Sequence, residues 1–84
     1  MHVEFLGIPR ERAGIAEVEV DARTLGEALA KLAARFPALG ELITPGGLHP
    51  AVAASLNGDI FVSDPTTRLH AGDRLILLSA DAGG

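Results

Sequence analysis

The sequence predicts an α+β fold in which a mixed sheet of four to five strands packs on one long helix. Three observations support this prediction: short strand patterns, one amphipathic helical stripe, and turn residues between them. The 84 residues are enough for one small domain. An apolar fraction of 48% with a net charge of only −4 favours a folded core over disorder.

The first 20 residues predict two strands with a long connection. Residues 3–6 alternate between apolar and polar side chains, and residues 15–20 continue this pattern with Glu17 and Glu19 on the side expected to face water. Residues 7–14 contain a proline and a charged cluster, which predicts a loop. We therefore expect a β-hairpin at the start of the chain.

The next segment predicts the long helix. Thr24 followed by Glu27 fits a capping box, in which the threonine begins the helix. Apolar residues then recur at helical spacing, and Pro37 ends the pattern. They are Leu25, Ala28, Leu29, Leu32, Ala33 and Phe36. This stripe has to cover one face of the sheet.

The second half of the chain predicts three more strands. Residues 42–43 are expected to form a helical turn before a Pro-Gly-Gly break. Residues 52–56 and 60–62 follow as strands, joined by Asn57-Gly58, a pair that readily adopts positive φ in a tight turn. Residues 75–78 are apolar at every position, which predicts a strand in the middle of the sheet.

This order of elements, with one crossing helix and a central last strand, describes the β-grasp arrangement. We expect a β-grasp domain over residues 1–79 and a flexible tail over residues 80–84. The tail ends in Gly83-Gly84, and residues without a Cβ atom can enter a channel too narrow for side chains. An extended tail of this length reaches about 17 Å, so it could present a terminal carboxylate inside a partner.

Composition argues against several classes of function. The chain has no cysteine, which removes disulfides and thiolate chemistry. Its basic residues are scattered and it has no Trp or Tyr, so nucleic-acid binding is not expected. No apolar run is long enough to span a bilayer and no signal peptide is recognisable, so we expect a cytoplasmic protein without a membrane partner.

No catalytic group is expected either. His2, His49 and His70 lie far apart in the sequence and lack metal-ligand spacing. Asp64 and Asp73 are interpreted as turn residues that hydrogen-bond the local backbone. We therefore expect no bound metal or cofactor. The chain would act as a carrier or co-substrate, or as a non-catalytic subunit of a larger enzyme.

Several segments resemble those of the MoaD/ThiS family of ubiquitin-like, β-grasp sulfur carriers. The resemblance covers essentially the whole chain, and Gly83-Gly84 matches the functional terminus of the family. Within the family, the chain is most similar to the small subunit of molybdopterin synthase. The other matching segments are residues 9–14, residues 24–29 with 35–39, Leu56-Asn57-Gly58 and residues 69–75.

The resemblance implies that an adenylating enzyme of the ubiquitin-activating type uses ATP and Mg²⁺ to activate the carboxylate of Gly84. Gly83, which has no side chain, would let the end of the chain enter a narrow channel in that enzyme. A persulfide donor would then convert the activated carboxylate to a thiocarboxylate. In molybdopterin synthase, a larger catalytic subunit would receive the tail and use its sulfur for the molybdenum cofactor.

Residues 78–84 contain no proline, whereas the molybdopterin branch commonly ends in Pro-Pro-Val-x-Gly-Gly. Other readings therefore stay open. They are a carrier for cysteine, thiamin, tRNA-thiolation or secondary-metabolite synthesis, a ubiquitin-like modifier joined to lysines, and a β-grasp interaction module with an unused tail.

Strand alternation also predicts a partner surface. If Val3 and Phe5 face the helix, Leu6 faces the other way, and a solvent-exposed Arg74 would place alternate residues of the last strand on that same outer face. Apolar patches of this kind commonly mark association sites, unless a loop or the C-terminal segment covers them. The predicted partner-binding residues are Leu6, Ile60, Ile76 and Leu78 on the sheet and Ala80, Asp81 and Ala82 in the tail.

Overall fold

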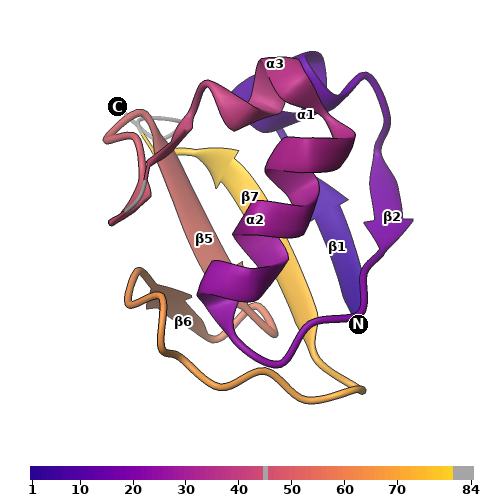
Figure 1. Cartoon of the computed structure of the whole chain (residues 1–84), viewed down its shortest axis with the longest axis vertical. Helices are drawn as coiled ribbons and strands as arrows, with labels where there is room; N and C mark the ends of the chain where they lie inside the picture. Colours follow the sequence, from indigo (N-terminus) through magenta and orange to yellow (C-terminus); the bar gives the residue numbers. More distant parts are fainter. Residues whose placement is uncertain (45, 81–84) are drawn as a thin grey trace.

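A five-stranded mixed sheet covered on one face by a long helix forms the body of the protein (Figure 1). The computed structural model describes residues 1–44 and 46–80. The strand order is β2-β1-β7-β5-β6, with β1 parallel to β7 and the other neighbours antiparallel. The strands are β1 (His2–Phe5), β2 (Glu17–Glu19), β5 (Val52–Leu56), β6 (Ile60–Val62) and β7 (Arg74–Ser79). This is the predicted β-grasp fold.

The helix α2 (Leu25–Arg35) begins where the sequence predicts. Thr24 is its N-cap, and its Oγ1 accepts a hydrogen bond of 3.2 Å from the backbone N–H of Glu27. This bond satisfies one of the free donors of the first turn. The predicted stripe faces the sheet, since its leucines at 25, 29 and 32 and its alanine at 28 are all buried.

The core lies between α2 and the inner face of the two central strands. Val3 pairs with Leu75 and Phe5 pairs with Leu77 in the parallel ladder, and all four side chains are fully buried. The ring of Phe36, which follows α2, meets Phe5 edge to face at 5.8 Å between centroids. The ladder between β1 and β7 is therefore the centre of the core, on the face of the sheet that α2 covers.

The loop predicted over residues 7–14 is instead a short helix, α1 (Ile8–Ala13). Pro9 lies in its first turn, where a backbone N–H would have no helical partner, so the ring costs no hydrogen bond. Gly14 ends the helix in the left-handed conformation and donates its N–H to the carbonyl of Arg10 at 2.9 Å. The prediction was wrong because a proline at a helix start was taken for a helix breaker.

The segment after α2 also differs from the prediction. The helical turn lies at α3 (Pro37–Gly40), earlier than the expected position, and buries Leu39 completely. Ile43, expected in that turn, instead lies in β3 (Ile43–Thr44), which pairs with β4 (Gly47–Leu48) as a separate two-stranded sheet. Pro37 therefore begins a second helix as well as ending the first. None of the helices formed by the described residues is long and apolar enough to cross a membrane.

The predicted turns are confirmed. Asn57 and Gly58 both have positive φ, at 57° and 72°, as a tight hairpin turn requires. Asp64 accepts hydrogen bonds from the backbone N–H and hydroxyl of Thr66, both at 2.8 Å. Asp73 accepts from the side-chain amide of Asn57 at 3.0 Å and from the backbone N–H of residue 70 at 2.7 Å.

These bonds to Asp73 predict an acid-sensitive turn. The hydrogen bond from Asn57, followed by that from the backbone N–H of His70, holds the pKa of Asp73 below its ordinary value. A carboxylate with a lowered folded-state pKa stabilises the fold above the unfolded-state pKa, and its contribution disappears as pH falls through the folded-state pKa. Urea unfolding of Asp73→Asn should show lower stability at pH 7 and a flatter loss of stability below about pH 4.

Asp59→Asn is the matched control for this prediction. Asp59 belongs to the Asn57 turn, and its carboxylate makes no side-chain hydrogen bond within residues 1–44 and 46–80. Its replacement should leave the pH profile of stability close to that of the unsubstituted protein. A profile for Asp73→Asn that matches this control would contradict the prediction.

Candidate functional site

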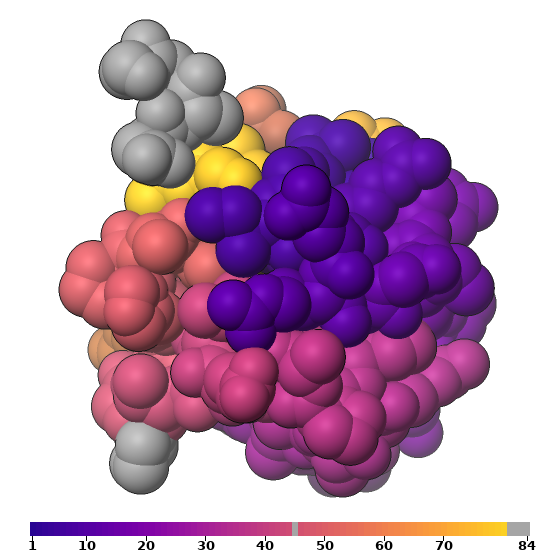
Figure 2. Space-filling model, turned by 90° about the horizontal axis from the view of Figure 1, so that it is seen from above, coloured from indigo at the N-terminus to yellow at the C-terminus, as the bar shows by residue number. Residues whose placement is uncertain are grey.

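The point at which the C-terminal segment leaves the sheet is held from both sides. The Oγ of Ser79, the last residue of β7, accepts a hydrogen bond of 2.8 Å from the N–H of Ile8 at the start of α1. On the other side, the N–H of Ala80 donates to the carbonyl of Ala51 at 2.8 Å. Figure 2 shows the end of β7 (yellow) beside the N-terminal segment (indigo) and the residues around the start of β5 (coral). The backbone is therefore fixed as far as Ala80.

Of the predicted tail residues, Ala80 lies within the part of the chain that the structure describes, and it is exposed. Asp81, Ala82, Gly83 and Gly84 lie outside the described residues, so their predicted roles stay predictions.

Gly7 allows α1 to approach the end of β7. Its φ of 62° and ψ of −130° form a conformation that residues with a Cβ rarely adopt. A Cβ atom at this position would lie 2.3 Å from the Oγ of Ser79, which accepts the hydrogen bond from Ile8. A larger residue would therefore have to displace the contact that holds the base of the tail.

We expect Gly7→Ala to destabilise the protein by about 3 kcal/mol or more, since backbone strain and a steric clash add. Gly14→Ala is the matched control. Gly14 also has positive φ, at 74°, but no atom lies within 4 Å of a Cβ placed there. Gly14→Ala should therefore lower the free energy of unfolding by only about 1–2 kcal/mol, the cost of a left-handed backbone conformation. Chemical unfolding measures both values, and equal losses would contradict a close approach at Gly7.

The outer face of the sheet, opposite α2, carries an apolar patch near the base of the tail. The predicted alternation is confirmed, since Leu75 and Leu77 are buried whereas Ile76 and Leu78 are partly exposed. Leu6 follows β1 and is 45% exposed. The register adds Ala53 and Phe61, because Ala53 pairs with Leu78, and Ser55 pairs with both Ile76 and Phe61. We call this surface the outer-face patch: Leu6, Ala53, Phe61, Ile76 and Leu78.

Ile60 does not belong to this patch, which corrects the prediction. Ile60 pairs with Leu56 and Val62 pairs with Ala54, and Ala54 is buried on the helix side of the sheet. Residues that pair directly point to the same face, so Ile60 points to the helix side, where it is 56% exposed. The outer residue of β6 is Phe61, at 74% exposed. Phe61 could not be assigned to the outer face from the sequence, because the sequence alone does not determine which residues pair across the hairpin.

A groove of about 380 Å³ adjoins the patch along β5 and β6. Phe61 and Ala53 belong to both the patch and this groove. The segment before β5 closes the other side of the groove with His49 and Pro50. The remaining lining residues are Gly46, Leu48, Val52, Ala54, Val62 and Ser63.

The opposite end of the outer face is charged. His2 pairs with Arg74 at the start of β7, and three glutamates of β1 and β2 surround the imidazole. The hydrogen bond to Glu19, followed by the charges of Glu17, Glu19 and Glu4, raises the pKa of His2 above its usual value despite partial burial. The spacing of the three histidines along the chain gave no sign of this cluster, because the neighbours of His2 are glutamates from two strands.

Comparison with known proteins identifies the type of domain. A chain in the crystal structure of the Amycolatopsis orientalis BexX/CysO complex is 26% identical, with a TM-score of 0.80 over 99% of this chain and 98% of that chain. SAMP1 from Haloferax volcanii is 28% identical, with a TM-score of 0.75 over 99% and 97% of the two chains.

CysO from Mycobacterium tuberculosis, described as an antigen, is 28% identical, with a TM-score of 0.77 over 94% and 97% of the two chains. No curated protein sequence matches the chain significantly. The model of the ThiS family matches residues 3–84, which includes all of the five-stranded sheet except His2, together with α2 and the Gly-Gly end. The chain therefore belongs to the ThiS family of ubiquitin-like sulfur carriers.

Proposed function

We propose that the carboxylate of Gly84 is the acceptor of sulfur, and that residues 80–84 act as a tail that enters partner enzymes. The observation that supports this most strongly is the family match, which continues through Gly83-Gly84. The base of the tail supports it further. Ser79 and Ala80 are each held by a hydrogen bond, so the tail would start from a fixed point beside the outer-face patch.

The chemistry takes place on the Gly84 carboxylate and requires an activating partner. A carboxylate oxygen attacks the α-phosphorus of ATP and expels pyrophosphate, which gives an acyl-adenylate. A donor persulfide then attacks the activated carbonyl and expels AMP. A second thiol cleaves the resulting acyl disulfide, which releases the thiocarboxylate and leaves a new disulfide on the donor. ATP and Mg²⁺ belong to the partner in this scheme.

We propose the molybdopterin synthase small subunit as the specific role, with a larger catalytic subunit as the final partner. This rests on the resemblance of residues 9–14 and 69–75 to the MoaD/ThiS family, within which the chain is most similar to that subunit. Delivery to cysteine, thiamin, tRNA-thiolation or secondary-metabolite synthesis is the alternative within sulfur transfer. The similarity to two CysO structures is the observation that favours an alternative sulfur acceptor.

Intact mass spectrometry tests the thiocarboxylate directly. The full chain is incubated with the adenylating enzyme of its host, ATP, Mg²⁺ and a persulfide donor. We expect a mass increase equal to the replacement of one oxygen by sulfur, located at Gly84 by fragmentation. Omission of ATP should prevent it. An unchanged mass with an adenylating enzyme that is active on another carrier would refute the proposal.

A second candidate function is protein modification, in which Gly84 forms isopeptide bonds with lysines of target proteins. The likeness to a small archaeal modifier protein from H. volcanii, 28% identical with a TM-score of 0.71, favours this candidate. Both functions begin with adenylation of the same carboxylate. Branched Gly-Gly remnants on lysines of host proteins would support modification, and their absence beside an abundant thiocarboxylate would exclude it.

We also propose that the outer-face patch contacts the adenylating enzyme. Phe61 and Ile60 offer a matched pair, because they are adjacent and both exposed but point to opposite faces. Phe61→Ser should weaken the complex about tenfold, as removal of a central aromatic contact does at other interfaces. Ile60→Ser should leave affinity within about twofold. Titration calorimetry measures both, and equal effects would exclude the outer face as the docking surface.

A further inference from the structure

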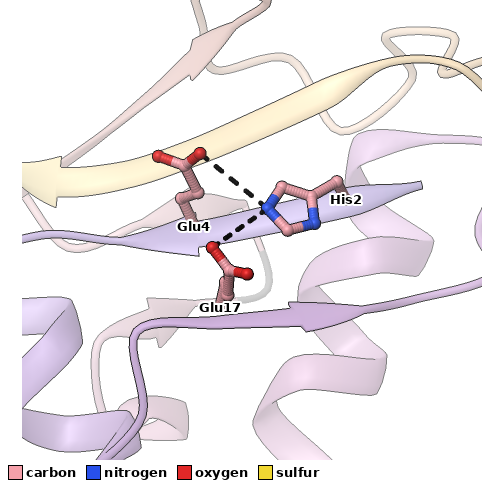
Figure 3. A group of neighbouring side chains, drawn as sticks. All are labelled: His2, Glu4 and Glu17. Carbon is pink, nitrogen blue, oxygen red and sulfur yellow. Dashed lines mark ion pairs between the residues drawn. The ribbon is translucent and has the colours of Figure 1, made fainter.

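A histidine and three glutamates meet at the β1–β2 end of the outer face, away from the tail. His2 and Glu4 lie two residues apart on β1, so they point to the same side of the sheet. Glu17 and Glu19 have the same spacing on β2, where Glu17 pairs with Glu4 and Glu19 pairs with His2. Figure 3 shows the carboxylates of Glu4 and Glu17 directed at one nitrogen of the His2 ring.

Among the described residues, carboxylate oxygens lie beside both ring nitrogens of His2. Nδ1 lies 3.0 Å from Oε1 of Glu19, whereas Nε2 lies 3.4 Å from Oε2 of Glu17 and 3.8 Å from Oε1 of Glu4. A neutral imidazole carries one N–H, and ionised carboxylates only accept. If Nδ1–H donates to Glu19, the lone pair of Nε2 faces two anionic oxygens. A cation at Nε2 would turn this repulsion into attraction.

Two other positive charges lie beside carboxylates of the cluster, one of them at the Glu4 oxygen that faces Nε2. The Nε of Arg74 lies 3.6 Å from Oε1 of Glu4, and the N-terminal ammonium lies 3.8 Å from Oε2 of Glu19. Neither group contacts Nε2 of His2 in the described residues. A positive charge between Nε2 and its two carboxylates, carried by a ring proton or by a bound cation in its place, is therefore favourable.

The spacing of these atoms suits a small divalent ion. One ligand atom from each of His2, Glu4 and Glu17 lies within 4.8 Å of the other two. Zinc bonds of 2.0–2.2 Å in a tetrahedral arrangement place ligand atoms about 3.4 Å apart. The distances of 3.4 Å and 3.8 Å from Nε2 therefore need only small side-chain shifts. Glu19 on Nδ1 completes the carboxylate–histidine pairing that usually orients a metal-bound imidazole.

We propose that His2, Glu4 and Glu17 bind Zn²⁺ or a similar divalent transition metal through Nε2 and one oxygen of each carboxylate, with Glu19 as a positioning residue. Glu17 is 62% exposed, so the fourth coordination position would be open to water. The ion would join β1 to β2. The site lies at the start of β7 and the tail follows Ser79, about 17 Å further along the strand. Metal binding is thus separate from the proposed sulfur chemistry.

Zinc titration of the full chain, prepared without a polyhistidine tag and in a buffer that does not chelate metals, tests the site. Calorimetry at neutral pH should show saturable binding of one ion per chain, with the largest NMR shifts on the His2 ring. Bound zinc should raise Tm, because it binds only the folded arrangement. His2→Gln and Glu17→Gln should abolish saturable binding, and Glu19→Ala should weaken it about tenfold.

His70→Gln is the matched control, because His70 is also exposed but lies outside the cluster. It should bind zinc as the unsubstituted chain does. Circular dichroism of His2→Gln should confirm that the fold is retained. The proposal fails if the unsubstituted chain gives neither heat nor shifts, or if His2→Gln binds with unchanged affinity. Thiocarboxylate formation should be equal in His2→Gln and the unsubstituted chain, so the two proposals are tested independently.

Discussion

Deletion of Gly84 is expected to abolish both acyl-adenylate and thiocarboxylate formation while leaving Tm unchanged. The loss should be nearly complete, because the new terminal carboxylate on Gly83 would not reach the position at which the Gly84 carboxylate reacts. A chain that ends at Gly83 also carries its carboxylate one residue, about 3.5 Å, short of the proposed reaction position. The rate of such a reaction depends steeply on the position of the reacting carboxylate, since a displacement of 1 Å can lower the rate about 100-fold.

Two controls accompany this deletion. Gly72→Ala changes a glycine at which a Cβ atom would meet nothing within 4 Å, so it should keep both stability and thiocarboxylate formation. Thermal unfolding of the deletion variant should match that of the full chain, since the described chain is anchored through Ser79 and Ala80. Sulfur transfer by the shortened chain at more than a trace rate would contradict the assignment of Gly84.

Phe5→Ala should cause the largest loss of stability of any single substitution considered for this protein. The ring is fully buried, packs edge to face on Phe36 and lies opposite Leu77 in the central ladder. Removal of a buried phenylalanine ring typically costs about 3–5 kcal/mol. Small domains are stable by only about 5–15 kcal/mol, so this one substitution should remove a large fraction of the total stability.

Phe61→Ala removes the same side chain from an exposed position and is the matched control. Phe61 is 74% exposed, so its loss should change the free energy of unfolding by less than about 0.5 kcal/mol. Urea unfolding followed by circular dichroism compares the two variants. A loss for Phe5→Ala no larger than that for Phe61→Ala would mean that the β1–β7 ladder is not the centre of the core.

The parts of the fold set by local sequence could be predicted. Thr24 caps α2 and the leucines behind it face the sheet, because capping and helical periodicity depend on residues within a few positions of one another. The turn at Asn57-Gly58 and the apolar strand at residues 75–78 are local signals of the same kind. Their order was enough to predict the β-grasp fold.

Features set by register or by distant contacts could not be predicted. Ile60 and Phe61 exchange faces if the hairpin register shifts by one residue, and the sequence did not fix that register. Gly7 meets Ser79 across 72 positions of the chain. The glutamates beside His2 come from both strands of a hairpin whose pairing had to be known. The error at Pro9 had another source, since proline begins helices as well as interrupting them; Pro37 ends the pattern of α2 as predicted and also begins α3.

The parallel pairing of β1 with β7 has a consequence for synthesis of the protein. Strand β1 is synthesised long before its partner β7, so the middle of the sheet cannot form until Ser79 is available. Contacts between such distant segments delay folding. A chain terminated before Arg74 would lack the central strand together with the tail. An enzyme that recognises the folded sheet would therefore not recognise such a fragment.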